Sequence, residues 1–151
     1  MNFSNFLLMR HEILLLTITL LLLVGEIFIS KSKKSSLVHL AIFLFGIHTA
    51  IGFFQIDESS IFGGSFQTNN LIHFFKNVLN IGVFILLLQS ADWIQEKIVN
   101  QNRGTEFFIL LFTSLLGMYF MISSGDFLMF YIGLELSTLP VAALAAYETS
   151  K

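Results

Sequence analysis

One carboxylate, Glu135, stands well inside the apolar stretch 124–146 of this 151-residue chain. At about 1.5 Å of helix per residue, Glu135 would lie about 12 Å from one end of that stretch and about 18 Å from the other. A carboxylate at the centre of a bilayer costs about 2.5–3.5 kcal/mol on insertion scales. Glu135 must therefore be protonated, paired with a cation or facing water, and each state makes its protonation controllable. We expect Glu135 to act as a proton relay; the alternative is a protonated acid that only hydrogen-bonds within a helix bundle.

Pro140, the only proline of the chain, follows five residues later. It lacks an amide donor and clashes with the carbonyl of Leu136, so we expect a helix kink beside Glu135. Ser137 and Thr138 are placed to compensate the freed carbonyl. The kink itself is equally compatible with a structural and a functional role. Small residues further on predict close helix packing: Ala142, Ala143, Ala145 and Ala146.

A polar stripe in residues 71–90 gives the second candidate. His73, Lys76, Asn77 and Asn80 have the i, i+3, i+4, i+7 spacing of one helix face. Lys76 would lie within about 5 Å of the depth of Glu135, counting about 1.5 Å per residue. Lys76 is thus a possible charge partner of Glu135; the alternative is that it extends its ammonium group to the membrane surface.

Three other ionisable residues carry weaker signals. Glu26 stands near Lys31 at the end of an apolar run, which favours a local ion pair or a side chain reaching the surface over a proton site. His39 and His48 fall on roughly opposite faces of one helix, so they do not converge on a metal ion. Packing or interfacial roles are expected for both.

The composition places these residues in a membrane. Hydrophobic residues make up 55% of the chain and charged residues 12%, against about 45–50% and about 25% in soluble domains. Five stretches approach the roughly 20 apolar residues needed to cross a bilayer as a helix: about 13–29, 37–54, 71–90, 107–123 and 127–147. We therefore predict an all-α integral membrane fold forming a single multi-span domain over residues 1–151.

The charges of the connecting segments predict the orientation. Lys31, Lys33, Lys34, Lys97, Arg103 and Lys151 fall on one side if the spans alternate, whereas Arg10 and Lys76 fall on or near the other. The positive-inside rule then places the N-terminus outside and the C-terminus in the cytoplasm. The net charge of −2 gives no indication of nucleic-acid binding, and the lack of cysteine excludes disulfides and cysteine-bound clusters within this chain.

Turn signals mark two connections. Gly63-Gly64 in the segment 55–70 permits a β-hairpin, and a plain polar loop is an equal alternative. The segment 92–106 has mixed charge and is expected to be a linker, with a turn at Asn102-Arg103-Gly104. Asp126 is expected to cap the start of the last helix.

The residues 126–140, DFLMFYIGLELSTLP, resemble the antiporter-like membrane subunits of respiratory complex I. The frame GTEFFILL at 104–111, Gly117-Met118, the run 123–126 and FFK at 74–76 are most similar to the subunit N family. The resemblance covers essentially the whole chain, but only the first third or so of a typical member.

The resemblance implies a fold of fourteen transmembrane helices, of which about five are present, and proton translocation coupled to electron transfer from NADH to quinone. Glu135 matches the glutamate that in this family pairs with a lysine two helices later, beyond residue 151. Other complex I membrane subunits and the lipid bilayer would be partners, and NADH, flavin, iron–sulfur clusters and quinone would belong to partner subunits. The implied location is a bacterial inner membrane. The resemblance also implies that the chain is a fragment or a split gene product, and we expect little activity of this piece alone. A subunit of a multisubunit cation/proton antiporter and a non-catalytic membrane scaffold or remnant remain the alternatives.

Overall fold

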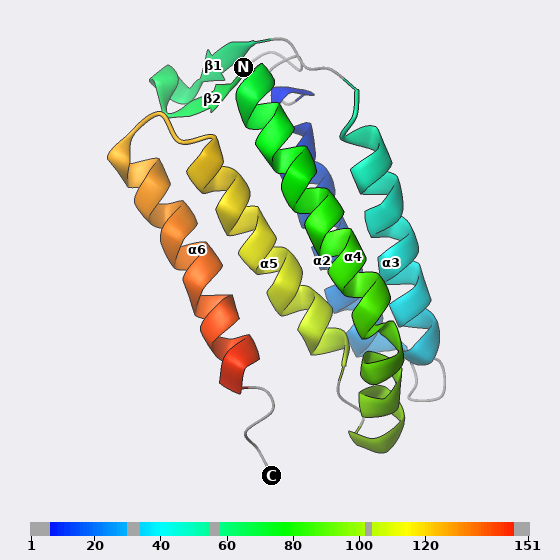
Figure 1. The fold of residues 1–151 in the computed structure, drawn as a ribbon. Coiled ribbons are helices and arrows are strands. Elements are labelled where there is room, and N and C mark those ends of the chain that lie inside the picture. The colour runs from blue at the N-terminus through cyan, green and yellow to red at the C-terminus, as the bar shows by residue number, and fades with distance from the viewer. Residues whose placement is uncertain (1–6, 30–33, 55–57, 102–103, 147–151) are drawn as a thin grey trace.

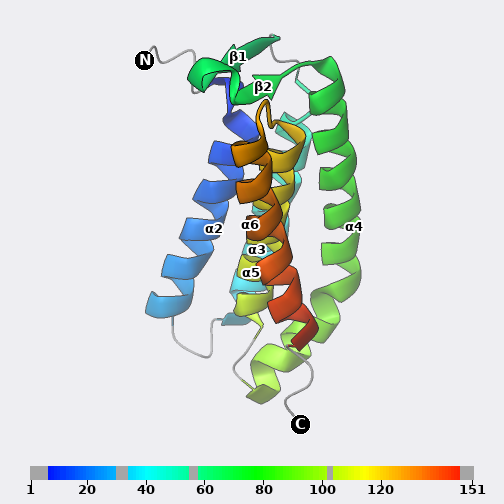
Figure 2. The same ribbon diagram turned by 90° about the vertical axis from the view of Figure 1, so that its left-hand side faces the viewer.

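Five long helices run side by side along one common direction and form the body of the protein (Figures 1 and 2). The computed structural model describes residues 7–29, 34–54, 58–101 and 104–146. The helices are α2 (Arg10–Phe28), α3 (Lys34–Ile51), α4 (Asn70–Gln101), α5 (Thr105–Ile122) and α6 (Phe127–Ala146). All five are long and apolar enough to cross a membrane, which confirms the predicted all-α membrane fold.

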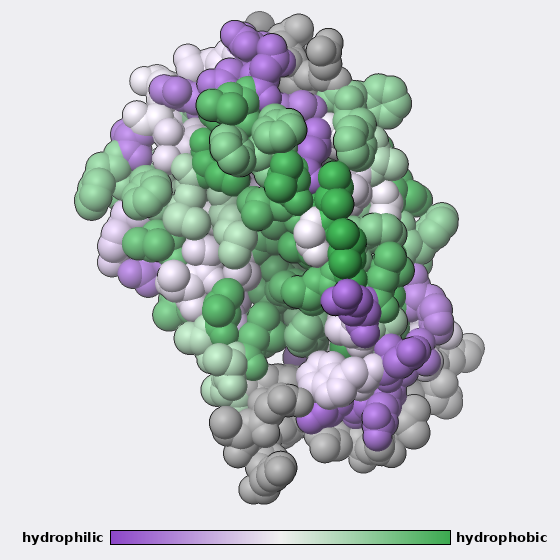
Figure 3. All heavy atoms as spheres, viewed as in Figure 1, coloured by the Kyte–Doolittle hydropathy of each residue, from purple (hydrophilic) through white to green (hydrophobic). Residues whose placement is uncertain are grey.

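The apolar surface is arranged as lipid requires. Large hydrophobic side chains remain exposed along α2, α3, α4 and α6, whereas the apolar side chains of α5 are buried or half-buried, and hydrophilic residues gather towards the two ends of the bundle in Figure 3. A helix satisfies its own backbone hydrogen bonds, so its apolar side chains can face hydrocarbon without cost. The buried core is formed where the helices meet, for example at the stacked rings of Phe45 and Phe112, whose centroids are 5.0 Å apart.

The connection between α3 and α4 is a β-hairpin, which settles the choice left open between a hairpin and a polar loop. Strands β1 (Ser59–Ile61) and β2 (Phe66–Thr68) pair antiparallel, and the 3-10 turn η2 (Phe62–Gly64) joins them. Gly63 and Gly64 have φ of 68° and 98°, the left-handed region that glycine adopts without strain. The glycine pair thus makes the turn as predicted.

The hairpin is held against the connection between α5 and α6. The amide of Gln67 donates to the carbonyl of Ser123 (2.8 Å), and the amide of Gly125 donates to the carbonyl of Ser65 (2.7 Å). A Cβ atom on Gly125 would lie 1.8 Å from the carbonyl oxygen of Gly64, so only glycine fits there. The hairpin end of the bundle is therefore tied to the residues that precede α6.

Helix α4 corrects one expectation from the sequence. The mixed-charge segment after residue 90 was expected to be a linker, but α4 continues for 32 residues to Gln101. Residues such as Gln95, Glu96 and Lys97 are good helix formers, so the helix extends beyond the apolar run. The expected turn residues Asn102 and Arg103 lie outside the described residues, as do Lys31, Lys33, Tyr147 and Lys151.

Helices α5 and α6 approach each other through two glycines. A Cβ atom on Gly117 would lie 2.4 Å from the amide nitrogen of Ser137, and one on Gly133 would lie 2.7 Å from that of Met121. Small residues allow such backbone contact between membrane helices. We expected the alanines near the end of α6 to serve this purpose, but Ala142, Ala143, Ala145 and Ala146 are exposed in the structure.

Candidate functional site

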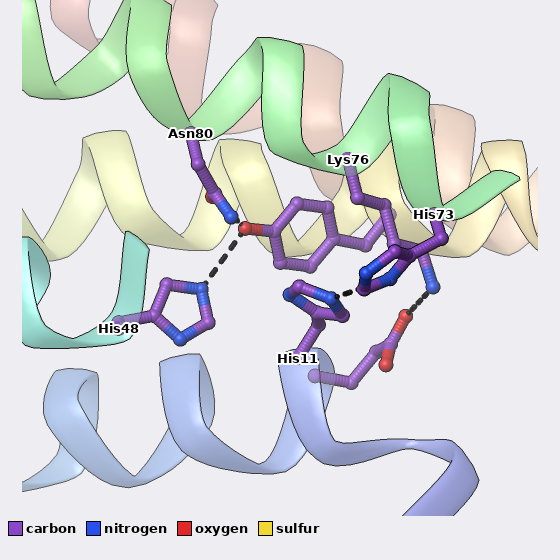
Figure 4. A network of polar contacts seen from close by, with 7 residues as sticks. His11, His48, His73, Lys76 and Asn80 are labelled. Carbon is purple, nitrogen blue, oxygen red and sulfur yellow. Dashed lines mark hydrogen bonds and ion pairs between the residues drawn. The ribbon is translucent and has the colours of Figure 1, made fainter. Parts of the chain in front are cut away.

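The polar stripe of α4 faces the interior of the bundle, where it meets charged residues of α2 (Figure 4). Lys76 is paired with Glu12 at 2.5 Å, and the two side chains are 2% and 3% exposed. Removing two charges from water is costly, and their mutual attraction offsets that cost only when the geometry is close. The Nζ–Oε1 contact is also a hydrogen bond, so the pair meets this condition.

This pairing corrects our expectation for Lys76. Its ammonium group neither reaches the membrane surface nor pairs with Glu135; its partner is Glu12, on α2. Helix α6, which carries Glu135, packs mainly on α5. Any influence of Lys76 on Glu135 would therefore have to act across α5 or through the hairpin.

Three histidines, one tyrosine and one asparagine surround the ion pair. His11 Nε2 lies 3.1 Å from His73 Nδ1, and His48 Nε2 lies 3.1 Å from the Tyr119 hydroxyl. That hydroxyl also donates to Asn80 Oδ1. The labelled side chains of Figure 4 point towards one another from α2, α3 and α4. We call His11, Glu12, His48, His73, Lys76, Asn80 and Tyr119 the polar cluster.

Aromatic rings close the cluster on the hairpin side. The ring of Phe66, on β2, is fully buried, and its centroid is 5.1 Å from Lys76 Nζ. The Tyr119 ring lies 5.7 Å from the same atom. An ammonium group over an aromatic ring gains electrostatic stabilisation while water is kept away.

Sequence reasoning found only part of this cluster. The stripe of His73, Lys76 and Asn80 was recognised, but the first span was taken to begin at residue 13, which left out His11 and Glu12. His48 was assigned to packing, and Tyr119 was not considered. An acid directly before an apolar run and a lysine at similar depth in another span are the signal that could have identified the pair.

Glu135 has a different environment. Its side chain is exposed on α6, on a face that the described residues leave uncovered, and it interacts with Tyr131 one turn earlier. Bulky apolar residues share the exposed surface of this helix: Ile132, Leu134, Leu139 and Val141. A carboxylate in such a position needs a partner or water from beyond these helices.

Pro140 lies inside α6, which continues without interruption to Ala146. Within the described residues, the predicted compensation of the Leu136 carbonyl by Ser137 or Thr138 does not form. Ser137 and Thr138 donate their hydroxyls to the carbonyl of Leu134, at 2.9 Å each, and not to that of Leu136. Ser114 of α5 donates to the carbonyl of Ser137 at 3.0 Å, a carbonyl that the missing amide of Pro140 does not free. This bond joins α5 and α6 two residues after Glu135.

The remaining candidates have structural contacts. Glu26 pairs with Lys34 at 3.7 Å, at the end of the bundle away from the hairpin, so it forms a local ion pair; Lys31 lies outside the described residues. His39 contacts the carbonyl of Ser35 and the amide of Gln95. Asp126 caps α6 as predicted, accepting from the amide of Met129 at 2.7 Å. Within the described residues, no group of three or more potential ligands is arranged for a metal ion.

The fold and the buried ionisable residues define a multi-pass α-helical membrane protein with charged groups in its interior. Curated proteins called NADH-quinone oxidoreductase subunit N match it along nearly its whole length. The one from Azobacteroides pseudotrichonymphae is 36% identical over 98% of this chain. Those from Phocaeicola vulgatus and Herminiimonas arsenicoxydans are 32% and 29% identical over 100% and 98% of it. No protein-family model matches the chain.

The chain thus belongs to the family of NADH-quinone oxidoreductase subunit N. It spans about a third of the length of these relatives, with 31% and 32% of the first two covered. The resemblance noted from residues 126–140 is confirmed by this similarity over the whole sequence.

Proposed function

We propose that this chain is part of the membrane arm of a proton-translocating NADH:quinone oxidoreductase, in which Glu135 binds and releases the translocated proton. The observation that carries the proposal is the whole-length similarity to proteins named NADH-quinone oxidoreductase subunit N. The position of Glu135 supports it, because this carboxylate lies within a span and faces a surface open to a further helix. The names of these relatives favour the oxidoreductase over a cation/proton antiporter subunit.

The chain's own residues provide proton handling and no electron carrier. Electrons from NADH would pass through flavin and iron–sulfur clusters to quinone in partner subunits. The exposed apolar face of α6 would contact other membrane helices of the complex, which would bring a cation near Glu135. A change in that cation's distance would alter the proton affinity of Glu135, since an opposite charge favours the ionised acid.

Purification of the tagged chain from its own membranes tests this assignment. We expect it to purify with a large complex that oxidises NADH and reduces quinone. Recovery without NADH-oxidising subunits would contradict the proposal and favour an antiporter subunit or a scaffold.

The proposed location is the bacterial inner membrane, with the N-terminus and the hairpin outside and the C-terminus in the cytoplasm. The basic residue Lys34 lies at the opposite end of the bundle from the hairpin, in keeping with the positive-inside rule. A reporter enzyme fused after Lys34 should be active only in the cytoplasm; extracytoplasmic activity would overturn this orientation.

A further inference from the structure

We propose that the polar cluster is a second proton-binding site, separate from Glu135, in which three imidazoles share one proton beside the Glu12–Lys76 pair. The first observation that supports this proposal is that the polar cluster consists of ionisable and polar side chains inside the helix bundle. Four membrane-spanning helices contribute to it: α2, α3, α4 and α5. Ionisable residues are costly inside a membrane bundle and usually have a function there.

The hydrogen bonds give the cluster a route for a proton. His11 and His73 form one linked pair, and His48, Tyr119 and Asn80 form a second linked group. The His11 ring lies between them, 5.7 Å from the His48 ring and 6.0 Å from the Tyr119 ring, measured between centroids. An imidazole can accept a proton on one nitrogen and release one from the other.

Buried polar atoms without partners within the described residues are concentrated in the same place. They include Glu12 Oε2, His48 Nδ1, His73 Nε2 and Asn80 Nδ2. Buried polar atoms of natural proteins nearly always have a partner, so each such exception calls for an explanation. A site that takes up a proton explains these atoms, because the imidazole nitrogens are acceptors for it and the second oxygen of Glu12 can stabilise the resulting charge.

The polar cluster itself carries no net charge before uptake. Glu12 and Lys76 balance each other, and the neutral imidazoles add no charge. In the uptake step, a proton from water forms an N–H bond at His73 Nε2. The proton on His73 Nδ1 moves along the hydrogen bond to His11 Nε2, leaving His73 neutral and His11 with one positive charge.

The neighbouring charges limit the uptake to one proton. Burial and the like charges of Arg10 and Lys76 oppose proton uptake by His11 and His73. His48 and Tyr119 are the titratable groups that face His11 from α3 and α5.

The hairpin controls access to this site. Phe66 covers Lys76, and the Ser65–Asp126 and Gln67–Ser123 contacts hold the hairpin to the residues before α6. The hairpin therefore links the polar cluster physically to the helix that carries Glu135. Use of the site in translocation rests on the proposed function; proton binding itself does not.

Nitrogen-15 NMR of histidine-labelled chain in lipid vesicles tests the proposal. The substitution His39→Asn removes the one histidine outside the cluster and leaves only His11, His48 and His73. As the pH is lowered from 8 towards the acid limit of folding, we expect one imidazole equivalent of the three to become imidazolium. Three imidazoles that stay neutral throughout, or that all become charged, would overturn the proposal.

Two further variants keep the result from depending on one substitution. His73→Asn should abolish the uptake, and Glu12→Gln should weaken it about tenfold or more, since the carboxylate no longer stabilises the cation. Phe66→Ala should speed proton exchange with bulk water and leave the total uptake unchanged. Uptake unaffected by both His73→Asn and Glu12→Gln would contradict the proposal, even if Glu135 still supports translocation.

Discussion

The ammonium group of Lys76 on α4 lies 2.5 Å from the carboxylate of Glu12 on α2, and both are buried between membrane helices. Removing one partner leaves the other charge buried and unpaired, which costs about 3–5 kcal/mol. Glu12→Gln should therefore destabilise the chain by that amount in detergent unfolding experiments.

Two comparisons check this explanation. The double variant Glu12→Gln/Lys76→Met should recover much of the lost stability, because it removes both charges. Glu26→Gln breaks a more exposed pair with Lys34, with side chains 21% and 10% exposed, and should cost about 1 kcal/mol or less. Equal losses in Glu12→Gln and Glu26→Gln would show that burial does not matter to the first pair.

The contact between α5 and α6 depends on Gly117. An alanine there would bring its Cβ atom to 2.4 Å from the backbone of Ser137, and overpacking of this kind costs about 1–3 kcal/mol. Gly117→Ala should lower the stability measured by thermal unfolding and separate the two helices. The matched control is Gly82→Ala on α4, where a Cβ atom meets nothing within 4 Å; it should be neutral or slightly stabilising. A stable Gly117→Ala protein would contradict the close packing.

The helix framework was predictable from the sequence, whereas the contacts between helices were not. Runs of apolar residues locate all five helices, and Gly63-Gly64 and Asp126 locate a turn and a cap. The end of α4 was missed because helix-forming polar residues follow its apolar run. The partner of Lys76 was missed because hydropathy shows depth along each span but not which helices are neighbours. Glu135 was recognised because the cost of a carboxylate in a membrane depends on its depth along its own span, which hydropathy does show.

The hairpin contact should depend on pH through Asp126. The hydroxyl of Ser65 and the amide of Met129 donate to this carboxylate and hold its pKa below the usual range. Because the folded-state pKa is lowered, the stabilising effect is fully present above the unfolded-state value of about 3.9. It is lost as the pH falls through the lower folded-state pKa.

Hydrogen exchange can follow this loss. The protection factors of the Gly125 and Gln67 amides, which bond across the hairpin contact, should fall as Asp126 becomes protonated. Ser65→Ala should reduce their protection at neutral pH and move the acid transition upward. Protection that does not change with pH in the native protein would contradict this role of Asp126.

The hydroxyl of Tyr119 should stabilise the polar cluster. It connects His48 and Asn80, which are both buried. Tyr119→Phe leaves two buried polar groups without this partner, which costs about 1–3 kcal/mol. Tyr131→Phe, on the exposed face of α6, should change the unfolding free energy by about 0.5 kcal/mol or less. Similar effects of the two substitutions would contradict a specific role for Tyr119.

The most direct test of the proposed function is proton pumping by the full assembly carrying Glu135→Gln. Glutamine keeps the size of the side chain, but its amide cannot bind and release a proton near neutral pH. In inverted membrane vesicles, we predict that NADH-driven acidification is abolished, while Glu26→Gln leaves it intact. Acidification at the native rate per NADH oxidised in the Glu135→Gln assembly would contradict the claim that Glu135 carries the proton.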